Sequence, residues 1–268
     1  MADGTAELHV ARRIAVEAGA IVRAGAGRRH ASDHKRSAVD LVTEYDKRSE
    51  AHVVAALRAA FPDDEVVAEE GGGQAGASGR RWLVDPLDGT TNFAHGLPFF
   101  CVSIAVEDAH GPLVGVIDAP ALGWHFYAAR GHGAFLVERG LAERRLAVSD
   151  TGALSASLLA TGFPYDTATS ARNNLAAWAH VYPLTQGLRR VGAAALDLCF
   201  VAAGWMDGYW ELKIKPWDVA AGALLVAEAG GRVTDYRGAP FRSDGGEILA
   251  TNGRLHDALA AALAAAQT

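Results

Sequence analysis

The chain carries at residues 82–93 the stretch Trp82-Leu83-Val84-Asp85-Pro86-Leu87-Asp88-Gly89-Thr90-Thr91-Asn92-Phe93, its most informative segment. The apolar start predicts a short buried strand, and the residues from Pro86 to Gly89 are turn formers. Asp85 and Asp88 lie three residues apart across this predicted turn, so their carboxylates and the Leu87 carbonyl can converge on one point. Such an all-oxygen ligand set suits a hard cation such as Mg²⁺ better than zinc or copper.

An isolated Asp-x-x-Asp-Gly run more often only shapes a turn, because Asp and Gly are ordinary turn residues. Here the neighbouring residues favour a metal site. The pair follows a buried strand and has Glu69-Glu70 shortly upstream. It also precedes Gly89-Thr90-Thr91, whose backbone N–H groups and hydroxyls could hold a phosphate. We therefore predict a site for metal and phosphate at the end of this strand.

Two further groups of charged residues precede predicted helices. Asp218 stands at the head of an apolar helix, where its structural alternative is an N-cap. A helix N-terminus also attracts a phosphate anion, so capping and metal binding are compatible there. Upstream lie Lys35 and the acids of residues 40–46. For these a solvated face or a cap is a real competitor, because Thr43 and Asp46 have the spacing of a capping box with Asp in place of Glu.

The overall composition limits the classes of function. The 268 residues are 50% hydrophobic, enough to bury a core as one large domain or two packed lobes. The net charge of -6 argues against direct nucleic-acid binding, which needs a clustered basic face. Cys101 and Cys199 lie apart in apolar runs and predict two buried thiols. No segment resembles a signal peptide or reaches the length of a membrane span, so we expect a cytoplasmic protein without membrane contact.

The order of predicted elements indicates an α+β protein. Leu8, Ala11, Ala15, Ala18 and Val22 have the spacing of one amphipathic helix face, and a second helix is predicted over residues 47–60. A strand follows at 65–68, and the glycine-rich run 71–79 predicts a mobile loop. Four β-prone runs between residues 99 and 137 predict an antiparallel meander.

Beyond Leu146 the predicted strands and helices are mixed. Strands are predicted at 158–160, 209–212, 232–234 and 248–250, and helices at 173–180, 193–203, 218–229 and the C-terminus. We expect residues 1–145 to form an α+β lobe with the metal-binding motifs and residues 146–268 to form an α/β lobe that completes the active site.

These motifs together resemble the inositol monophosphatase family, within the superfamily that also contains fructose-1,6-bisphosphatase. The matching pieces keep the family's order over residues 35–235. They are Lys35 with Asp40-Leu41-Val42-Thr43 and Asp46, Glu69-Glu70, the stretch 82–93, Val191-Gly192-Ala193-Ala194, and Trp217-Asp218-Val219-Ala220-Ala221-Gly222 with Glu228-Ala229-Gly230-Gly231. Lys213-Ile214-Lys215-Pro216 departs from the animal enzymes and looks more like the bacterial branch.

The resemblance implies a layered αβαβα sandwich and a homodimeric, lithium-sensitive phosphatase with two or three Mg²⁺ per active site. Carried over by motif, Glu69, Asp85 and the Leu87 carbonyl would hold the first metal. Asp85, Asp88 and Asp218 would hold a second. A third would sit beside Glu69.

The same resemblance implies roles in catalysis and substrate binding. Thr90, supported by Asp46, would help Glu69 and the first metal to orient the attacking water, and Lys35 is counted with these catalytic residues. The amides of Gly89 and Thr90 would contact the phosphate. The positions that match contacts to the rest of the substrate are Asp88, Gly192, Ala194 and Glu211.

The chemistry of phosphate esters agrees with these assignments. Spontaneous hydrolysis of a monoester dianion is extremely slow, so catalysis must neutralise charge and align water opposite the leaving oxygen. Two cations about 4 Å apart can clamp both oxygens. Four carboxylates gathered at one place would repel one another without such cations. We predict direct in-line attack by water without a phosphoenzyme intermediate.

The substrate prediction is myo-inositol monophosphate or a similar small polyol or sugar phosphate. Glu211 fits an acceptor for a polyol hydroxyl, and its alternative is a strand-end carboxylate paired with Lys213. Lys213 and Lys215 could favour a more anionic substrate or be solvated, the commoner fate of lysine. His95 is predicted to serve a turn or the surface rather than catalysis.

Other functions compete within the same fold. Phosphatases for histidinol phosphate, fructose 1,6-bisphosphate and 3′-phosphoadenosine 5′-phosphate share the metal motifs and differ in the walls of the pocket. A different class of hypothesis is a regulatory partner of the transcription machinery. Intact metal ligands argue against a purely non-catalytic role.

Overall fold

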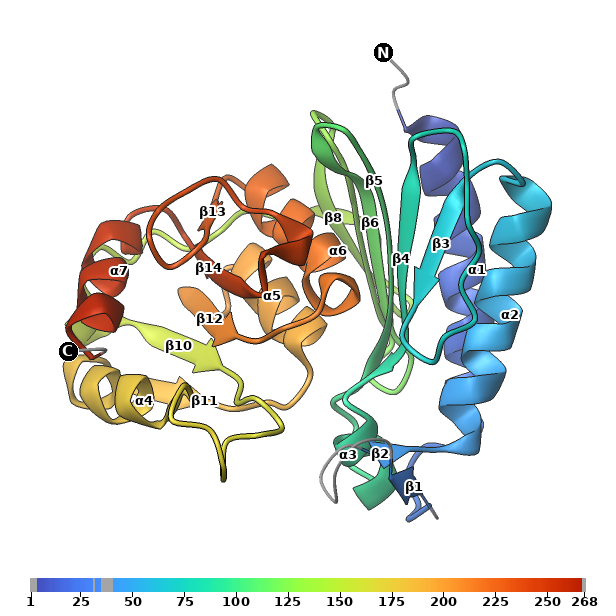
Figure 1. The fold of residues 1–268 in the computed structure, drawn as a ribbon. Helices are drawn as coiled ribbons and strands as arrows, with labels where there is room; N and C mark the ends of the chain where they lie inside the picture. The colour runs from blue at the N-terminus through green and yellow to red at the C-terminus, as the bar shows by residue number, and fades with distance from the viewer. Residues whose placement is uncertain (1–3, 31, 35–40, 267–268) are drawn as a thin grey trace.

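The computed structural model describes residues 4–30, 32–34 and 41–266 of the chain. Figure 1 shows five layers in the order helices, sheet, helices, sheet, helices. The predicted α+β fold with an αβαβα sandwich is therefore confirmed. Its layers place segments that are far apart in the sequence at one junction between the two sheets.

The larger sheet has seven strands in chain order. They are β3 (Glu65–Ala68), β4 (Arg81–Asp88), β5 (Cys101–Asp108), β6 (Gly111–Ala119), β7 (Trp124–Ala129), β8 (Gly133–Glu138) and β9 (Arg144–Arg145). Strands β3 and β4 pair in parallel, and every later neighbour pairs antiparallel. The meander predicted between residues 99 and 137 is thus confirmed.

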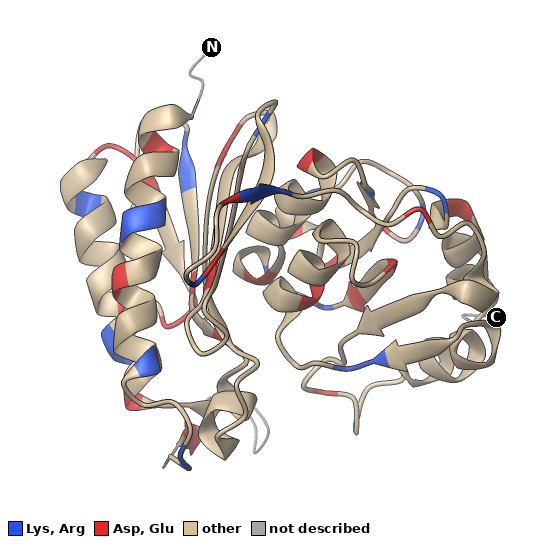
Figure 2. Ribbon diagram, turned by 180° about the vertical axis from the view of Figure 1, so that it is seen from behind, with Lys and Arg blue, Asp and Glu red and all other residues tan. Residues whose placement is uncertain are grey.

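Helices α1 (Thr5–Arg23) and α2 (Glu44–Ala60) cover the outer face of the larger sheet (Figure 1). Helix α2 begins three residues before the predicted start, because a capping box holds its first turn. The Tyr45 amide donates to Thr43 Oγ1 at 3.1 Å, and the Thr43 amide donates to Asp46 Oδ2 at 2.8 Å. Nearby, β1 (Asp33–His34) pairs with β2 (Leu41–Val42). Figure 2 shows Lys and Arg spread over the outer helices and loops with Asp and Glu among them.

The central helices α5 (Ala194–Ala202) and α6 (Pro216–Glu228) lie between the two sheets (Figure 1). Small residues let them pack closely. A Cβ on Gly115 of β6 would lie 2.8 Å from the Cα of Ala221 in α6, and a Cβ on Gly222 would lie 2.5 Å from Leu198 Cβ in α5. The main chains of the sheet and both helices therefore approach one another where larger side chains would not fit.

The smaller sheet is mixed and has the order β11 (Gly187–Arg189), β10 (Leu158–Thr161), β12 (Gly208–Leu212), β14 (Glu247–Thr251) and β13 (Arg232–Thr234). Its outer face is covered by α4 (Leu175–Val181) and α7 (His256–Ala265). The remaining elements are α3 (Thr90–His95) and the 3₁₀ turns η1 (Leu154–Ala156), η2 (Tyr182–Leu184) and η3 (Ser243–Gly245). The strands and helices predicted beyond Leu146 all occur, except that β11 was not predicted. Earlier in the chain, β1, β2, α3 and β9 were not predicted either.

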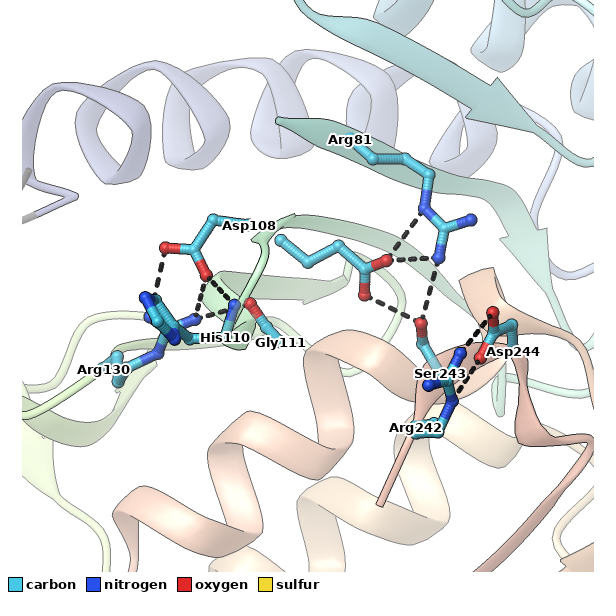
Figure 3. A network of polar contacts seen from close by, with 9 residues as sticks. Arg81, Asp108, His110, Gly111, Arg130, Arg242, Ser243 and Asp244 are labelled. Carbon is cyan, nitrogen blue, oxygen red and sulfur yellow. Dashed lines mark hydrogen bonds and ion pairs between the residues drawn. The ribbon is translucent and has the colours of Figure 1, made fainter. Parts of the chain in front are cut away.

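A polar network connects the larger sheet to the chain beyond α6 (Figure 3). Arg81 Nε of β4 donates to Glu107 Oε1 of β5 at 2.8 Å, and Ser243 Oγ of η3 donates to Glu107 Oε2 at 2.7 Å. Beside it, Arg130 pairs with Asp108 at 3.0 Å. Helix α6 also packs against strands β4 to β8, so one hydrophobic core extends across both sheets. The division into residues 1–145 and 146–268 stays a prediction.

The start of the glycine-rich run 71–79 is tethered to helix α2. The Glu50 carboxylate of α2 accepts hydrogen bonds from the amides of Glu70, at 2.7 Å, and Gly72, at 2.8 Å. Arg58 of the same helix donates to the Gly72 carbonyl at 3.0 Å. A Cβ on Gly72 would lie 2.7 Å from the Glu50 carboxylate, so glycine permits this close approach. Helix α2 therefore holds the start of this loop in place, and the mobility of the run 71–79 stays a prediction.

Two predictions from composition concern the cysteines and the membrane. Cys101 and Cys199 are buried free thiols, as predicted. Across the described residues, no helix is long and apolar enough to cross a membrane.

We expect Gly115→Ala to destabilise the fold, because its methyl group would meet the backbone of Ala221 at 2.8 Å. Overpacking of this kind lowers the free energy of unfolding by about 1–3 kcal/mol. Urea denaturation measures the change. Gly152→Ala is the matched control, since Gly152 is exposed and a methyl group there would have no atom within 4 Å. Equal midpoints for the two variants would contradict the proposed close approach.

Candidate active site

One pocket at the junction of the two sheets collects most of the predicted site residues. It is bounded by the ends of β3, β4 and β12 and by the N-terminal ends of α3, α5 and α6. The predicted residues that line it are Glu69, Asp85, Leu87, Asp88, Gly89, Thr90, Gly192, Ala194, Glu211 and Asp218. Asp46 lies behind the wall in contact with Thr90. Lys35 falls outside the described residues.

A β-bulge brings the two carboxylates of β4 to the same pocket. Asp85 pairs with Ser103 and Asp88 pairs with Cys101, so three steps along β4 match two steps along β5. The additional residue reverses the usual alternation of side chains, and both carboxylates reach the pocket. The predicted tight turn is therefore wrong, since the strand continues to Asp88. Pro86 is tolerated because a bulge interrupts the ladder of hydrogen bonds.

The starts of the two central helices hold two of the acids. Asp88 Oδ2 accepts from the Ala195 amide in the first turn of α5 at 2.7 Å. Asp218 is the third residue of α6, and its Oδ2 accepts from the Lys215 amide at 2.9 Å. Lys215 is thus the N-cap residue, and Asp218 caps the helix from inside its first turn. Both acids lie at the partly positive ends of helices, which favour anions.

Burial dominates the electrostatics of these acids. It raises the pKa of Asp85 well above its usual range, and the charges of Glu69, Asp88 and Asp218 raise it further. Burial likewise raises the pKa of Asp218 well above the usual range and the pKa of Asp88 to about 7. Carboxylates that repel one another in this way are stabilised by a bound cation.

The donor set fits hard divalent cations. Every donor is a carboxylate or carbonyl oxygen, which Mg²⁺ prefers, and the acids occupy one pocket. In the described part of the chain, no three acidic, histidine or cysteine side chains are placed so that they could hold a metal ion together. The match to a cation site therefore rests on the chemistry of these oxygen donors and on their shared pocket. The residues present therefore fit the metals that the motifs predict.

Thr90 and Asp46 form the predicted pair. Thr90 Oγ1 lies 2.9 Å from Asp46 Oδ1 and 3.0 Å from the Leu87 carbonyl, so its single proton is directed to these acceptors. Asp46 is fully buried, and its other oxygen accepts from the Thr43 hydroxyl at 2.6 Å. The capping box of α2 therefore orients Asp46, and Asp46 in turn orients the Thr90 hydroxyl.

Two glycines give the main chain close access to the pocket. Gly89 has φ 90°, and a Cβ there would lie 2.7 Å from the Phe99 carbonyl. Gly192 has φ 89° and lies two residues before the start of α5. Asn92 ties both segments together, because its amide donates to the Phe99 carbonyl at 2.7 Å and to the Val191 carbonyl at 2.9 Å. These contacts fix the turns whose amides the motifs assign to the phosphate and the substrate.

The alternative role predicted for Glu211 is wrong. Lys213 donates to Asp166 Oδ2 at 2.6 Å and to Ser170 Oγ at 2.8 Å, and it is directed to these acceptors rather than to Glu211. Glu211 instead accepts a hydrogen bond from the Tyr209 hydroxyl. Burial raises the pKa of Glu211 to about 7. Lys213 thus secures the loop after β10, and Lys215 is the exposed lysine of the pocket wall.

Sequence reasoning missed several residues of the wall. Arg190, Asp197 and the aromatic pair Phe163 and Tyr165 line the pocket. Asp197 is the one acid in the apolar helix α5, and a lone charge in such a helix is the signal that could have found it. His95 is exposed at the end of α3 and is not among the lining residues.

Comparison with known proteins gives a consistent result. A sequence model described as the inositol monophosphatase family matches residues 5–268. A Synechocystis protein named inositol-1-monophosphatase is 44% identical over 260 residues, which cover 96% of this chain and 88% of that protein. A Pseudomonas aeruginosa protein named Nus factor SuhB is 42% identical over 258 residues, covering 94% of this chain and 93% of that protein.

The fold has matching solved structures. The structure of an inositol monophosphatase from Anabaena superposes with a TM-score of 0.85 at 44% identity. The match covers 96% of this chain and 95% of the Anabaena chain. The likeness therefore extends over both sheets and the pocket between them.

We expect the acids of the pocket to destabilise the cation-free protein as the pH rises from 5 to 7. An unfolded Asp loses its proton near pH 3.8, whereas folded Asp88 keeps its proton up to about pH 7. Between these values the folded state binds more protons, so its stability falls with increasing pH. Chemical denaturation in EDTA should show this fall in the wild type relative to Asp88→Asn.

Comparing the wild type with Asp88→Asn cancels a contribution to stability that both proteins share and that changes with pH in the opposite direction. Burial lowers the pKa of His256 to about 4, which makes stability rise with pH in the same range for both proteins. Saturating Mg²⁺ should raise the stability of the wild type and abolish its relative loss. Parallel stability curves for the two proteins in EDTA would contradict the electrostatic account.

Proposed function

The chain belongs to the inositol monophosphatase family, and we propose that this phosphatase hydrolyses myo-inositol monophosphate or a similar small polyol phosphate to the alcohol and inorganic phosphate. The observation that carries the proposal is the convergence of acids from β4 and α6 in one pocket beside the Thr90–Asp46 pair. Such a site combines an oxygen ligand set with a group that can orient water. These are the two requirements for hydrolysing a phosphate monoester.

We propose Mg²⁺ as the metal, with two or three ions per active site. Glu69, Asp85 and the Leu87 carbonyl would hold one ion, and Asp85, Asp88 and Asp218 would hold another. A third would lie beside Glu69. When bound, the cations would neutralise the phosphoryl oxygens and lower the pKa of the attacking water.

Thr90 is proposed to orient that water through its hydroxyl oxygen. Its proton is directed to Asp46 or to the Leu87 carbonyl, which leaves the oxygen lone pairs to accept a hydrogen bond from water. Glu69 is the second proposed acceptor, and Lys35 is grouped with these catalytic residues by motif alone. Attack in line with the leaving oxygen then needs no covalent intermediate.

The other end of the substrate is proposed to meet the walls formed by α5 and β12. The amides of Gly89 and Thr90 would bind the phosphate, since backbone N–H groups at turns and helix starts favour anions. The alcohol would contact Asp88, Gly192, Ala194 and Glu211. Glu211 supports this assignment because it lines the pocket and is not engaged by Lys213.

The remaining features of the proposal follow from family membership. We propose a cytoplasmic homodimer that lithium inhibits. Relatives named Nus factor SuhB motivate a second candidate function, a regulatory partner of the transcription machinery. That role would act through a protein surface and would not require turnover at the acidic pocket.

A substrate panel tests the proposed reaction. We expect Mg²⁺-dependent phosphate release to be fastest with inositol 1-phosphate among substrates that include fructose 1,6-bisphosphate, histidinol phosphate, 3′-phosphoadenosine 5′-phosphate and β-glycerophosphate. Asp85→Asn should lower kcat by at least about 100-fold, because it removes charge from both proposed metal sites. Asp118→Asn changes a buried acid outside the pocket and should retain activity. A different dominant substrate would overturn the substrate assignment, and a regulatory function would survive in Asp85→Asn.

Replacement of Thr90 tests the orientation of water. Thr90→Val keeps the shape of the side chain but loses the hydroxyl, so we expect kcat to fall by about 10²–10⁴-fold with a smaller change in KM. Thr90→Ser retains the hydroxyl and should keep most of the activity. Steady-state kinetics at saturating Mg²⁺ measure both variants. Wild-type kcat in Thr90→Val would exclude the proposed role.

A further inference from the structure

Asp197 is an acid in a helix whose other residues are all apolar. Its helix, α5, reads Ala-Ala-Leu-Asp-Leu-Cys-Phe-Val-Ala, and all residues from Ala195 to Ala202 are buried. The Asp197 side chain is 2% exposed, yet it lines the pocket. Among the described residues, no donor forms a hydrogen bond with its Oδ1 atom. Asp197 thus lines the pocket, and one oxygen of its carboxyl group is buried without a partner in the described protein.

Such an oxygen opposes folding, because burial removes water from it and no donor replaces the water. An apolar residue at this position would carry no such cost. The arrangement resembles that of recognition sites, in which a buried polar group is satisfied only when the ligand binds.

A second carboxylate borders the same part of the pocket. Glu211 of β12 lies close enough for its charge to act on Asp197, and the positive charge of Arg190 acts on both acids. Glycine at position 162 keeps the approach to Glu211 open, since a Cβ there would overlap its carboxylate. Asp197 and Glu211 thus present hydrogen-bond acceptors from two elements, α5 and β12.

The chemistry of this wall favours neutral hydroxyl donors. The positive charge of Arg190 already acts on both acids, so a substrate ammonium group is not needed to balance them. Two acceptors on neighbouring elements match a ring that carries several hydroxyl groups. An aryl or alkyl leaving group would bury the Asp197 oxygen without a donor and would bind poorly.

We propose that Asp197 is a specificity-determining residue, which accepts a hydrogen bond from a ring hydroxyl of the substrate beside Glu211 and so selects polyol phosphates over phosphate esters without hydroxyl groups. This inference rests on the proposed phosphatase function and deepens it. Asp197 takes no part in the chemical step. Its removal should therefore slow the hydrolysis of substrates that carry ring hydroxyl groups and leave the hydrolysis of other phosphate esters largely unchanged.

The test compares inositol 1-phosphate with phenyl phosphate, whose leaving group has no hydroxyl besides the one released. We expect Asp197→Ala to lower kcat/KM for inositol 1-phosphate at least about 10-fold, mainly through KM. The kcat/KM for phenyl phosphate should change less than about threefold. Asp197→Asn keeps an acceptor oxygen and should lose less. It also serves as the test variant if the alanine variant does not fold.

Deoxy analogues of inositol 1-phosphate identify the hydroxyl. For the analogue that lacks the contacting hydroxyl, Asp197→Ala should cause no further loss, whereas the other analogues should lose as much as the parent compound. Asp207→Asn is the matched control, because Asp207 is a buried acid that pairs with Ser149 and the Leu158 amide outside the pocket. Asp207→Asn should lower the melting temperature of the protein and leave unchanged the ratio of kcat/KM for inositol 1-phosphate to kcat/KM for phenyl phosphate.

The outcomes separate this inference from the function on which it rests. Absence of Mg²⁺-dependent hydrolysis in the wild type overturns the proposed function. Hydrolysis with an equal loss for both substrates in Asp197→Ala overturns only the role of Asp197. A loss confined to histidinol phosphate also overturns it, since the acid would then recognise an ammonium group.

Discussion

Repulsion among carboxylates gathered in one pocket is the constraint on which this structure depends. Burial raises the pKa of Asp85, Asp88 and Asp218, and the charge of Glu69 raises all three further. A fold can hold such a group only if other contacts fix the backbone around it. Here the contacts are the paired strands of the larger sheet and the starts of two buried helices, which donate amides to Asp88 and Asp218. The acids of the site destabilise the fold locally, and the rest of the sandwich is stable enough to offset this cost. The same acids make the site suitable for binding cations.

Close packing of the central layer determines where these acids meet. Helix α6 can lie against the larger sheet because Gly115 and Ala221 place main chain against main chain. Its first turn then reaches the bulged end of β4, and Ser103 of β5 donates to the Trp217 carbonyl at 3.1 Å. Helix α5 packs on α6 through Gly222, which brings the Ala195 amide to Asp88. Small residues in the interior therefore have a direct effect on the geometry of the pocket.

The pocket has two chemically different ends. Asp85, Asp88 and Asp218, with the Thr90–Asp46 pair, form the end suited to cations and phosphate, and this end explains the reaction class of the family. Asp197, Glu211 and Arg190 also line the pocket, and we propose that they form the end that meets the alcohol. The first end is built largely from motifs of contiguous sequence. The second is assembled from separate elements of the C-terminal half, so differences in substrate choice can arise there without disturbing the first.

Local patterns in the sequence were sufficient to predict the type and order of most helices and strands, because helical and strand periodicity depend on neighbouring residues. The motifs likewise placed the acids and Thr90 in one site, and their identity does not depend on distant packing. Tertiary structure alone decided that Asp85–Asp88 is a bulged strand, that α2 holds the start of the glycine-rich run, and that Lys213 binds Asp166 rather than Glu211. It also decided that Asp197 lines the pocket. Each of these depends on which residues meet across layers, and the register of strands and the packing of helices are set by the whole fold.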